Sequence, residues 1–213
     1  MLYWYYRAMP GEGAARVSRI RVLLSKALAV LLLGALLVTQ PALAGDPPGD
    51  YMLQFIGFLL LLVAAFGRTW SSLFIAGNKN STVVRSGPYS MVRHPLYFFS
   101  LAGFAGAGLA FESLTITAGF IGVFALTHVP TMLAEERKLA RKYGSDYVSY
   151  AASVPRLVPA LSLYHAPALV EADTRTFTRA MVEAALIMLV FPVAWAIEIF
   201  REMGLLPVLL VLP

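Results

Sequence analysis

The chain has 213 residues, of which 59% are hydrophobic and only 14% charged, and its mean hydropathy is +0.71. These values lie outside the range of soluble domains and indicate an integral membrane protein. The length allows about five spanning helices of ~20 residues each and excludes a large soluble domain. The chain contains no cysteine, which excludes disulfides, thiolate metal sites and a cysteine nucleophile.

Apolar stretches predict an all-α, polytopic membrane bundle of about five helices. In chain order the stretches are 21–44, 51–76, 95–111, 114–134 and 180–200. The third is short, and we expect it to be tilted or partly buried. Brief linkers follow the first and third stretches, so each is expected to form an antiparallel hairpin with its successor. We divide the chain into an N-terminal hairpin (1–76), a core (77–160) and a C-terminal extension (161–213).

Positively charged side chains predict the orientation of this bundle. They lie at the N-terminus up to Lys26, after the second stretch and after the fourth, whereas linkers 45–50 and 112–113 contain none. The positive-inside rule therefore predicts a cytoplasmic N-terminus, with the loops after the second and fourth stretches on the same side. Contact of these cations with membrane lipids accounts for the net charge of +5, so no nucleic-acid partner is expected.

The first stretch has a second interpretation. Cations at 19–26, an apolar run and Ala42-Leu43-Ala44 resemble a secretory signal peptide with its cleavage site. Removal of this segment would strain the charge-based topology of the loops that follow, so we favour its retention as a helix.

Two polar motifs bracket the third and fourth stretches. Residues 87–97 read GPYSMVRHPLY, and residues 135–159 read EERKLARKYGSDYVSYAASVPRLVP. The predicted hairpin brings both motifs to one end of the bundle. Adjacent carboxylates, an Arg-His pair and several tyrosines are costly at the mouth of an apolar hairpin without a ligand. The motifs therefore indicate a binding or reactive site at the membrane surface.

In their order and spacing, the motifs resemble those of the isoprenylcysteine carboxyl methyltransferase and phospholipid methyltransferase superfamily. The resemblance covers residues 77–160. It implies a membrane-embedded methyltransferase that uses S-adenosyl-L-methionine and holds this cofactor between the two motif segments. Two departures leave the methyl acceptor open. Phe98-Phe99-Ser100 follows Tyr97 where many relatives place a glycine, and a further apolar segment follows Pro159.

On this resemblance, the motif side chains match the chemical groups of the cofactor. Glu135 and Glu136 can accept from its ammonium or ribose hydroxyls, but consecutive helical positions point about 100° apart, so only one should face it. Arg93 and His94 suit the carboxylate or adenine, and tyrosine rings suit the sulfonium. The predicted cofactor-binding residues are Tyr89, Arg93, His94, Tyr97, Gly106, Gly108, Glu135, Tyr147 and Tyr150.

Catalytic and substrate-binding roles are assigned more narrowly. Methyl transfer needs alignment and, for an amine or thiol acceptor, removal of one proton, so no metal is expected. The predicted catalytic residues are Glu135, Glu136 and Arg156. Arg68, His128 and Arg156 are predicted to bind the acceptor, which is expected to enter from the bilayer.

Each weaker assignment has a structural alternative. Gly106-Ala107-Gly108 resembles a cofactor-binding element of the phospholipid branch, yet small residues at this spacing more often serve helix packing. His128 lies on the same helical face as Glu135, but a buried histidine bonded to a carbonyl is an equal alternative. The tyrosines from 143 to 150 could instead form an interfacial aromatic belt.

The leading prediction is methyl transfer to an aminophospholipid-like amine or an isoprenylcysteine-like carboxylate. Two rivals differ in their ligand. A membrane reductase of the sterol-reductase type would bind NADPH at the same end, and a non-enzymatic scaffold would bind no cofactor. The oligomeric state and the role of the C-terminal extension are left open.

Overall fold

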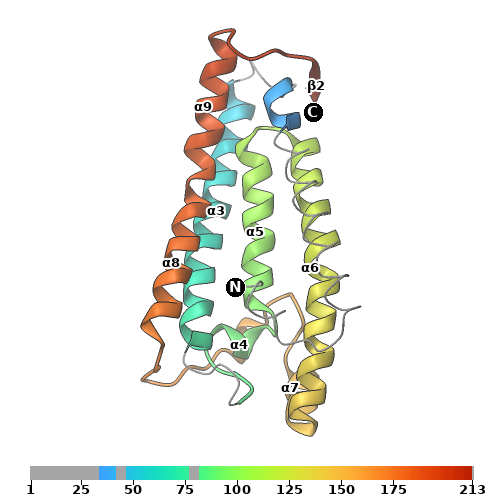
Figure 1. Ribbon diagram of the computed structural model, residues 1–213, viewed down its shortest axis with the longest axis vertical. Coiled ribbons are helices and arrows are strands. Elements are labelled where there is room, and N and C mark those ends of the chain that lie inside the picture. Colours follow the sequence, from blue (N-terminus) through green and yellow to red (C-terminus); the bar gives the residue numbers. More distant parts are fainter. Residues whose placement is uncertain (1–33, 42–46, 77–81, 213) are drawn as a thin grey trace, which may run out of the picture.

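The computed structural model describes residues 34–41, 47–76 and 82–212 (Figure 1). In chain order the elements are β1 (Thr39–Pro41), α3 (Pro47–Ala76), α4 (Pro88–Met91), α5 (Pro95–Ala110), α6 (Leu114–Tyr143), α7 (Ser145–Ser153), the 3₁₀ helix η2 (Leu161–Leu163), α8 (Thr174–Met188), α9 (Val190–Glu202) and β2 (Leu210–Leu212). The all-α membrane prediction is confirmed, apart from the two short strands.

Three helical segments in the described part are long and apolar enough to cross a membrane: Tyr51–Ala76, Leu114–Tyr143 and Thr174–Glu202. Helix α5 is apolar but shorter. The predicted number of five spans is therefore not confirmed. Most of the first predicted stretch, and with it the signal-peptide alternative, lies outside the described residues.

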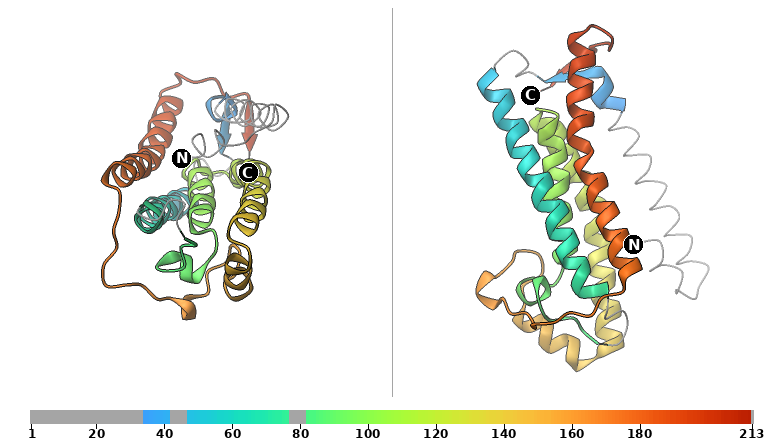
Figure 2. Two further views of the ribbon diagram at one scale, coloured as in Figure 1. Left: turned by 60° about the horizontal axis from the view of Figure 1, so that its bottom comes forward. Right: turned by 90° about the vertical axis from the view of Figure 1, so that its left-hand side faces the viewer.

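Helix α3 contacts both α5 and α8, and α5 forms the predicted antiparallel hairpin with α6 (Figure 2). Glycines allow these helices to approach closely. A Cβ atom added at Gly106 would lie 2.8 Å from the carbonyl oxygen of Gly57 on α3, and one added at Gly108 would lie 2.3 Å from Cα of Thr117 on α6. The Gly-x-Gly element thus occupies two helix interfaces, as the packing alternative predicted.

The C-terminal span consists of two helices that meet at Leu189. Pro192 explains the break, because it has no amide hydrogen and its ring opposes a helical carbonyl at Met188, four residues earlier. Beyond α9, β2 pairs in parallel with β1, and the guanidinium of Arg201 donates to the carbonyl of Leu36 at 3.1 Å. These contacts join the two ends of the described chain at the end of the bundle opposite α4 and α7 (Figure 1).

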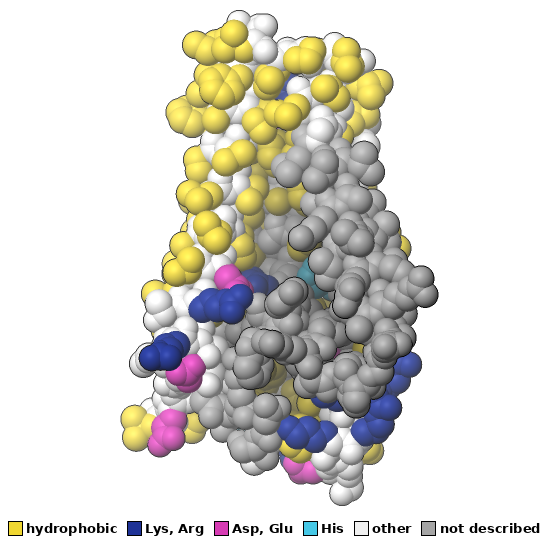
Figure 3. Space-filling model, in the orientation of Figure 1, with side chains coloured by type: hydrophobic (Ala, Val, Ile, Leu, Met, Phe, Trp, Pro, Cys, Tyr) yellow, Lys and Arg dark blue, Asp and Glu magenta, His cyan; other side chains and the backbone are white. Residues whose placement is uncertain are grey.

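The polar motifs lie together at the other end. Helix α4, the start of α5, the end of α6 and α7 gather there (Figure 1). In the space-filling view, hydrophobic side chains cover the upper part of the visible surface, and charged side chains gather toward the lower end (Figure 3). The two motifs thus share one side of the bundle, as predicted from the hairpin.

Candidate functional site

The first motif folds into one helical turn beneath the end of α3. Gly87 adopts φ +61°, and a Cβ atom at this position would lie 2.4 Å from the Phe74 ring, so the turn requires glycine. Pro88 begins α4 and Pro95 begins α5, and proline at a first helical position loses no hydrogen bond. The two prolines therefore fix the short link that carries Arg93 and His94.

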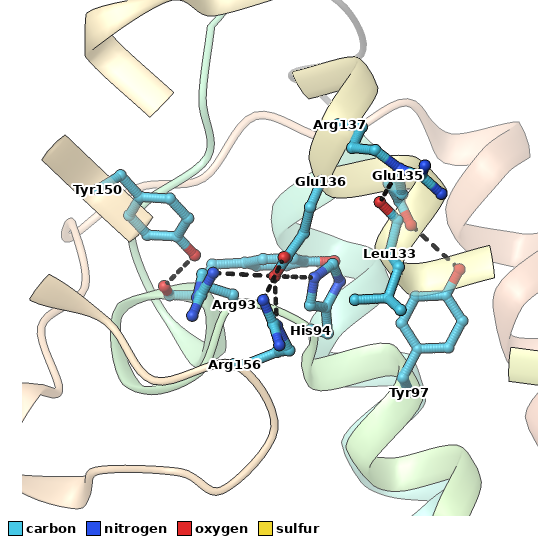
Figure 4. A network of polar contacts seen from close by, with 10 residues as sticks. Arg93, His94, Tyr97, Leu133, Glu135, Glu136, Arg137, Tyr150 and Arg156 are labelled. Atoms are coloured by element: carbon cyan, nitrogen blue, oxygen red, sulfur yellow. Dashed lines mark hydrogen bonds and ion pairs between the residues drawn. The ribbon is translucent and has the colours of Figure 1, made fainter. Parts of the chain in front are cut away.

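Three basic side chains converge on the carboxylate of Glu136 (Figure 4). One oxygen accepts from Arg93 at 2.9 Å and contacts Nε2 of His94 at 3.1 Å. Arg156 donates through Nε at 3.0 Å to this oxygen and through a terminal nitrogen at 2.9 Å to the other. The two motifs are thus joined directly, since Arg93 and His94 belong to the first and Glu136 and Arg156 to the second.

Burial differs across this cluster. The side chains of Glu136 and Arg93 are 12% and 15% exposed, whereas that of Arg156 is 48% exposed. Desolvation lowers the pKa of His94 despite its hydrogen bond with Glu136, so the imidazole is neutral at pH 7 and its Nε2 can donate to the carboxylate. The same carboxylate raises the pKa of Arg156.

Glu135 points to a different environment. Its carboxylate accepts a hydrogen bond from the Tyr97 hydroxyl at 3.0 Å. The Tyr97 ring packs edge-on against His128, which stacks on Phe124 at a centroid distance of 4.5 Å. The consecutive carboxylates therefore diverge as expected. Glu136 faces the loops, and Glu135 faces aromatic side chains between α5 and α6.

The tyrosines of α7 are core residues. Tyr147 and Tyr150 are only 4% and 5% exposed, and the Tyr150 hydroxyl donates to the Tyr89 carbonyl at 2.8 Å. Burial raises the pKa of the phenol groups of Tyr89, Tyr147 and Tyr150, which therefore stay protonated. The aromatic-belt alternative is wrong for Tyr147 and Tyr150, because both side chains are buried inside the protein.

Some buried donors around the cluster have no hydrogen-bond partner in the described part of the chain. They are the hydroxyls of Tyr89 and Tyr147 and Nε of Arg93, and of these the Tyr147 hydroxyl also lies close to the Arg93 side chain. Leaving such a group unsatisfied costs about 1–3 kcal/mol. All three can donate, so the arrangement suits a ligand that presents acceptor oxygens between the motifs.

Other predicted site residues lie apart from the Glu136 cluster. Arg68 donates to Ser100 and lies 3.6 Å from the carboxylate of Glu183 on α8. An acidic partner therefore neutralises the side chain that was predicted to bind an anionic substrate group. Sequence reasoning missed this pair, because the two residues lie 115 positions apart. Gly106 and Gly108 lie two to three turns along α5 from Tyr97, at the helix interfaces described above.

Comparison with known proteins places these motifs in a family. A family model described as phospholipid methyltransferase matches residues 52–146. The chain is 35% identical over 155 residues to the cobalt-zinc-cadmium resistance protein CzcN of Cupriavidus metallidurans. The aligned segment covers 73% of this chain and 71% of that protein. The chain belongs to the phospholipid methyltransferase family. It is also 32% identical over 158 residues to the nickel-cobalt-cadmium resistance protein NccN of Alcaligenes xylosoxydans xylosoxydans, covering 74% of each chain. No solved structure matches.

Membership of the phospholipid methyltransferase family confirms the resemblance found in the motifs and supports a membrane methyltransferase at the level of the family. The matched segment contains the first motif, Glu135 and Glu136. It ends before Tyr147, Tyr150 and Arg156. Tyr150 is connected to the site by its bond to the first motif, Arg156 by its bonds to Glu136, and Tyr147 by packing against Tyr150.

Proposed function

We propose that this protein transfers a methyl group from S-adenosyl-L-methionine to a lipophilic acceptor at one membrane surface. The observation that supports this most directly is the convergence of Arg93, His94 and Arg156 on Glu136, one residue from a second partly buried carboxylate, in a chain of the phospholipid methyltransferase family. By the positive-inside rule, we place this surface on the cytoplasmic side.

The residues present fit this cofactor. Its carboxylate and ribose hydroxyls offer acceptor oxygens for the buried hydroxyls of Tyr89 and Tyr147 and for Nε of Arg93, whose terminal nitrogen already bonds to Glu136. Its ammonium suits a carboxylate, and its sulfonium suits the face of an aromatic ring such as that of Tyr97. When bound, the cofactor supplies a methyl group on a positively charged sulfur.

The two carboxylates receive different roles in this proposal. The contacts of Glu136 with three basic side chains make it a residue that holds the motif segments in place. Glu135 accepts its hydrogen bond from Tyr97 and, among the described residues, has further acceptor positions on its oxygens. It is therefore our choice for the group that binds the ammonium or takes the proton of an amine acceptor, whereas a carboxylate acceptor releases no proton.

The acceptor class follows from the position of Glu135. The Tyr97 side chain bonds to it, and from Tyr97 a chain of ring contacts continues through His128 to Phe124 within the apolar hairpin. We propose that the acceptor is either an aminophospholipid-like amine or an isoprenylcysteine-like carboxylate that enters from the bilayer. Both relatives are named for resistance to divalent metals, so a screen for the acceptor would use lipid extracts from cells grown with and without cobalt and cadmium.

The test is calorimetric titration of S-adenosylhomocysteine into the protein in detergent, for the wild type and Glu135→Gln. Arg137→Gln is the matched control. The Arg137 side chain is near Glu135 in sequence, is exposed, and bonds only to the carbonyl of Leu133 among the contacts described. Binding to the wild type and the control, with loss in Glu135→Gln, supports the proposal. Binding of NADPH in place of S-adenosylhomocysteine would contradict it and favour a reductase.

A further inference from the structure

The segment between α7 and α8 has an unusual composition for a loop. Residues 157–170 read LVPALSLYHAPALV and contain no Lys, Arg, Asp or Glu. We call this segment the strap. It begins next to Arg156 of the Glu136 cluster and ends three residues before Asp173, whose side chain caps α8.

The strap turns apolar side chains outward. All residues from 161 to 169 are exposed. Leu169 is 89% exposed, Val158 76% and Leu161 75%. A run of this kind is unfavourable in water, since burying one large aliphatic side chain stabilises by about 1.5–3 kcal/mol relative to leaving it exposed. Such exposure indicates an apolar partner for this surface.

The inner edge of the strap is fixed to the first motif by backbone hydrogen bonds. The amide of Ala160 donates to the carbonyl of Met91 at 2.9 Å, and the amide of Gly87 donates to the carbonyl of His165 at 2.8 Å. The amide of His165 donates in turn to the Ser90 hydroxyl at 3.1 Å. Because these bonds hold the backbone, the apolar side chains cannot simply fold inward against α4.

The strap also runs beside a membrane-spanning helix. The Tyr164 ring contacts Trp70 of α3 at a centroid distance of 6.0 Å. Trp70 lies six residues before the end of α3, about 9 Å along the helix axis at 1.5 Å per residue. From there the strap crosses the end of the bundle to α8, another span (Figure 2). Tyr and Trp side chains are typical of the membrane–water interface.

We propose that the strap is inserted into the interfacial region of the leaflet next to the Glu136 cluster. In this arrangement Val158, Leu161 and Leu169 contact acyl chains. Tyr164 lies at headgroup level beside Trp70, and the exposed Arg175 at the start of α8 faces anionic headgroups. The strap thus forms a lipid-facing wall beside the candidate site. This inference does not depend on methyl transfer.

The absence of native cysteine makes a direct test possible. Single cysteines replace Leu161 or Leu169, carry a nitroxide label, and are studied in vesicles of phosphatidylcholine and phosphatidylglycerol. Ser149→Cys on the exposed face of α7 is the aqueous control, and Leu126→Cys, 65% exposed in the middle of α6, is the hydrocarbon control. Collision of each label with oxygen and with a water-soluble nickel complex is measured by electron paramagnetic resonance.

We expect both strap labels to favour oxygen over the nickel complex, as Leu126→Cys does, but at a shallower depth. Nickel accessibility equal to that of Ser149→Cys would overturn the proposal, because the strap would then lie in water. Protection from both reagents, with dipolar broadening between labels, would also overturn it and identify a second copy of the chain as the partner. Circular dichroism of each labelled protein verifies that the helices are intact.

Discussion

Replacing Glu136 by glutamine should reveal how unequally its basic partners contribute to stability. The substitution keeps the shape of the side chain and removes its charge. Arg93 and Arg156 both donate to this carboxylate at 2.9 Å, so distance alone does not distinguish them. Their exposure does, because Arg93 is 15% exposed and Arg156 48%.

The expected energies follow from that difference. A hydrogen bond between charged and largely desolvated groups contributes about 1.5–3 kcal/mol, which applies to Arg93. Water and salt screen the pair with Arg156, which should contribute no more than about 0.5–1 kcal/mol. Because glutamine leaves the buried guanidinium of Arg93 without a counter-charge, we expect Glu136→Gln to lower the free energy of unfolding by about 3 kcal/mol.

Two double-mutant cycles measure these contributions. Glu136→Gln is combined with Arg93→Met in one cycle and with Arg156→Met in the other, and reversible unfolding is followed in mixed detergent micelles. We expect a coupling energy of about 2 kcal/mol with Arg93 and about 0.5 kcal/mol with Arg156. Equal couplings, or a larger one with Arg156, would refute the argument from burial. Glu171→Gln, an exposed residue outside the cluster, controls for a general loss of charge.

Three further predictions concern single residues. Burial lowers the pKa of His94 below its ordinary value of about 6.5. The contribution of this residue to the free energy of unfolding should therefore be complete above pH 6.5 and fall as the pH decreases toward the lowered pKa. A His94→Gln variant with an unchanged pH profile of unfolding would contradict this. Tyr97→Phe should weaken binding of S-adenosylhomocysteine about tenfold in calorimetry, since Glu135 loses its donor, and unchanged affinity would exclude this role. Gly108→Ala should lower the free energy of unfolding by about 1–3 kcal/mol through a backbone clash with α6. Gly122→Ala meets open space and should leave this free energy unchanged, so equal effects in thermal unfolding would disprove the packing argument.

The parts of the fold that sequence could predict depend on local patterns. Apolar stretches predicted α3, the α5–α6 hairpin and the C-terminal span, because the membrane requires long apolar helices. Pro192 within the last apolar stretch is a local signal for the interruption between α8 and α9. The meeting of the motifs was predictable because each lies at the same end of one hairpin.

The rest depends on helix rotation and on distant contacts. Sequence could state that Glu135 and Glu136 diverge, but which one meets Arg93 follows from how α6 is turned toward the α4–α5 link. The pair between Arg68 and Glu183 requires α8 to pack on α3. Likewise, residues 210–212 become a strand only because β1 lies beside them, since an isolated apolar tripeptide has no local reason to be extended.

The orientation of α6 also bears on how two substrates of different polarity could meet. Glu136 and the half-exposed Arg156 face the loops, whereas Glu135, Tyr97 and His128 face the apolar hairpin. Methyl transfer by in-line displacement requires donor and acceptor on opposite sides of the methyl carbon. In our proposal, a water-soluble donor approaches this turn of α6 from the loops and a lipophilic acceptor from the bilayer. Glu135→Gln should then impair ligand binding more than stability, and Glu136→Gln should do the reverse, because only the second removes the charge that joins the two motifs.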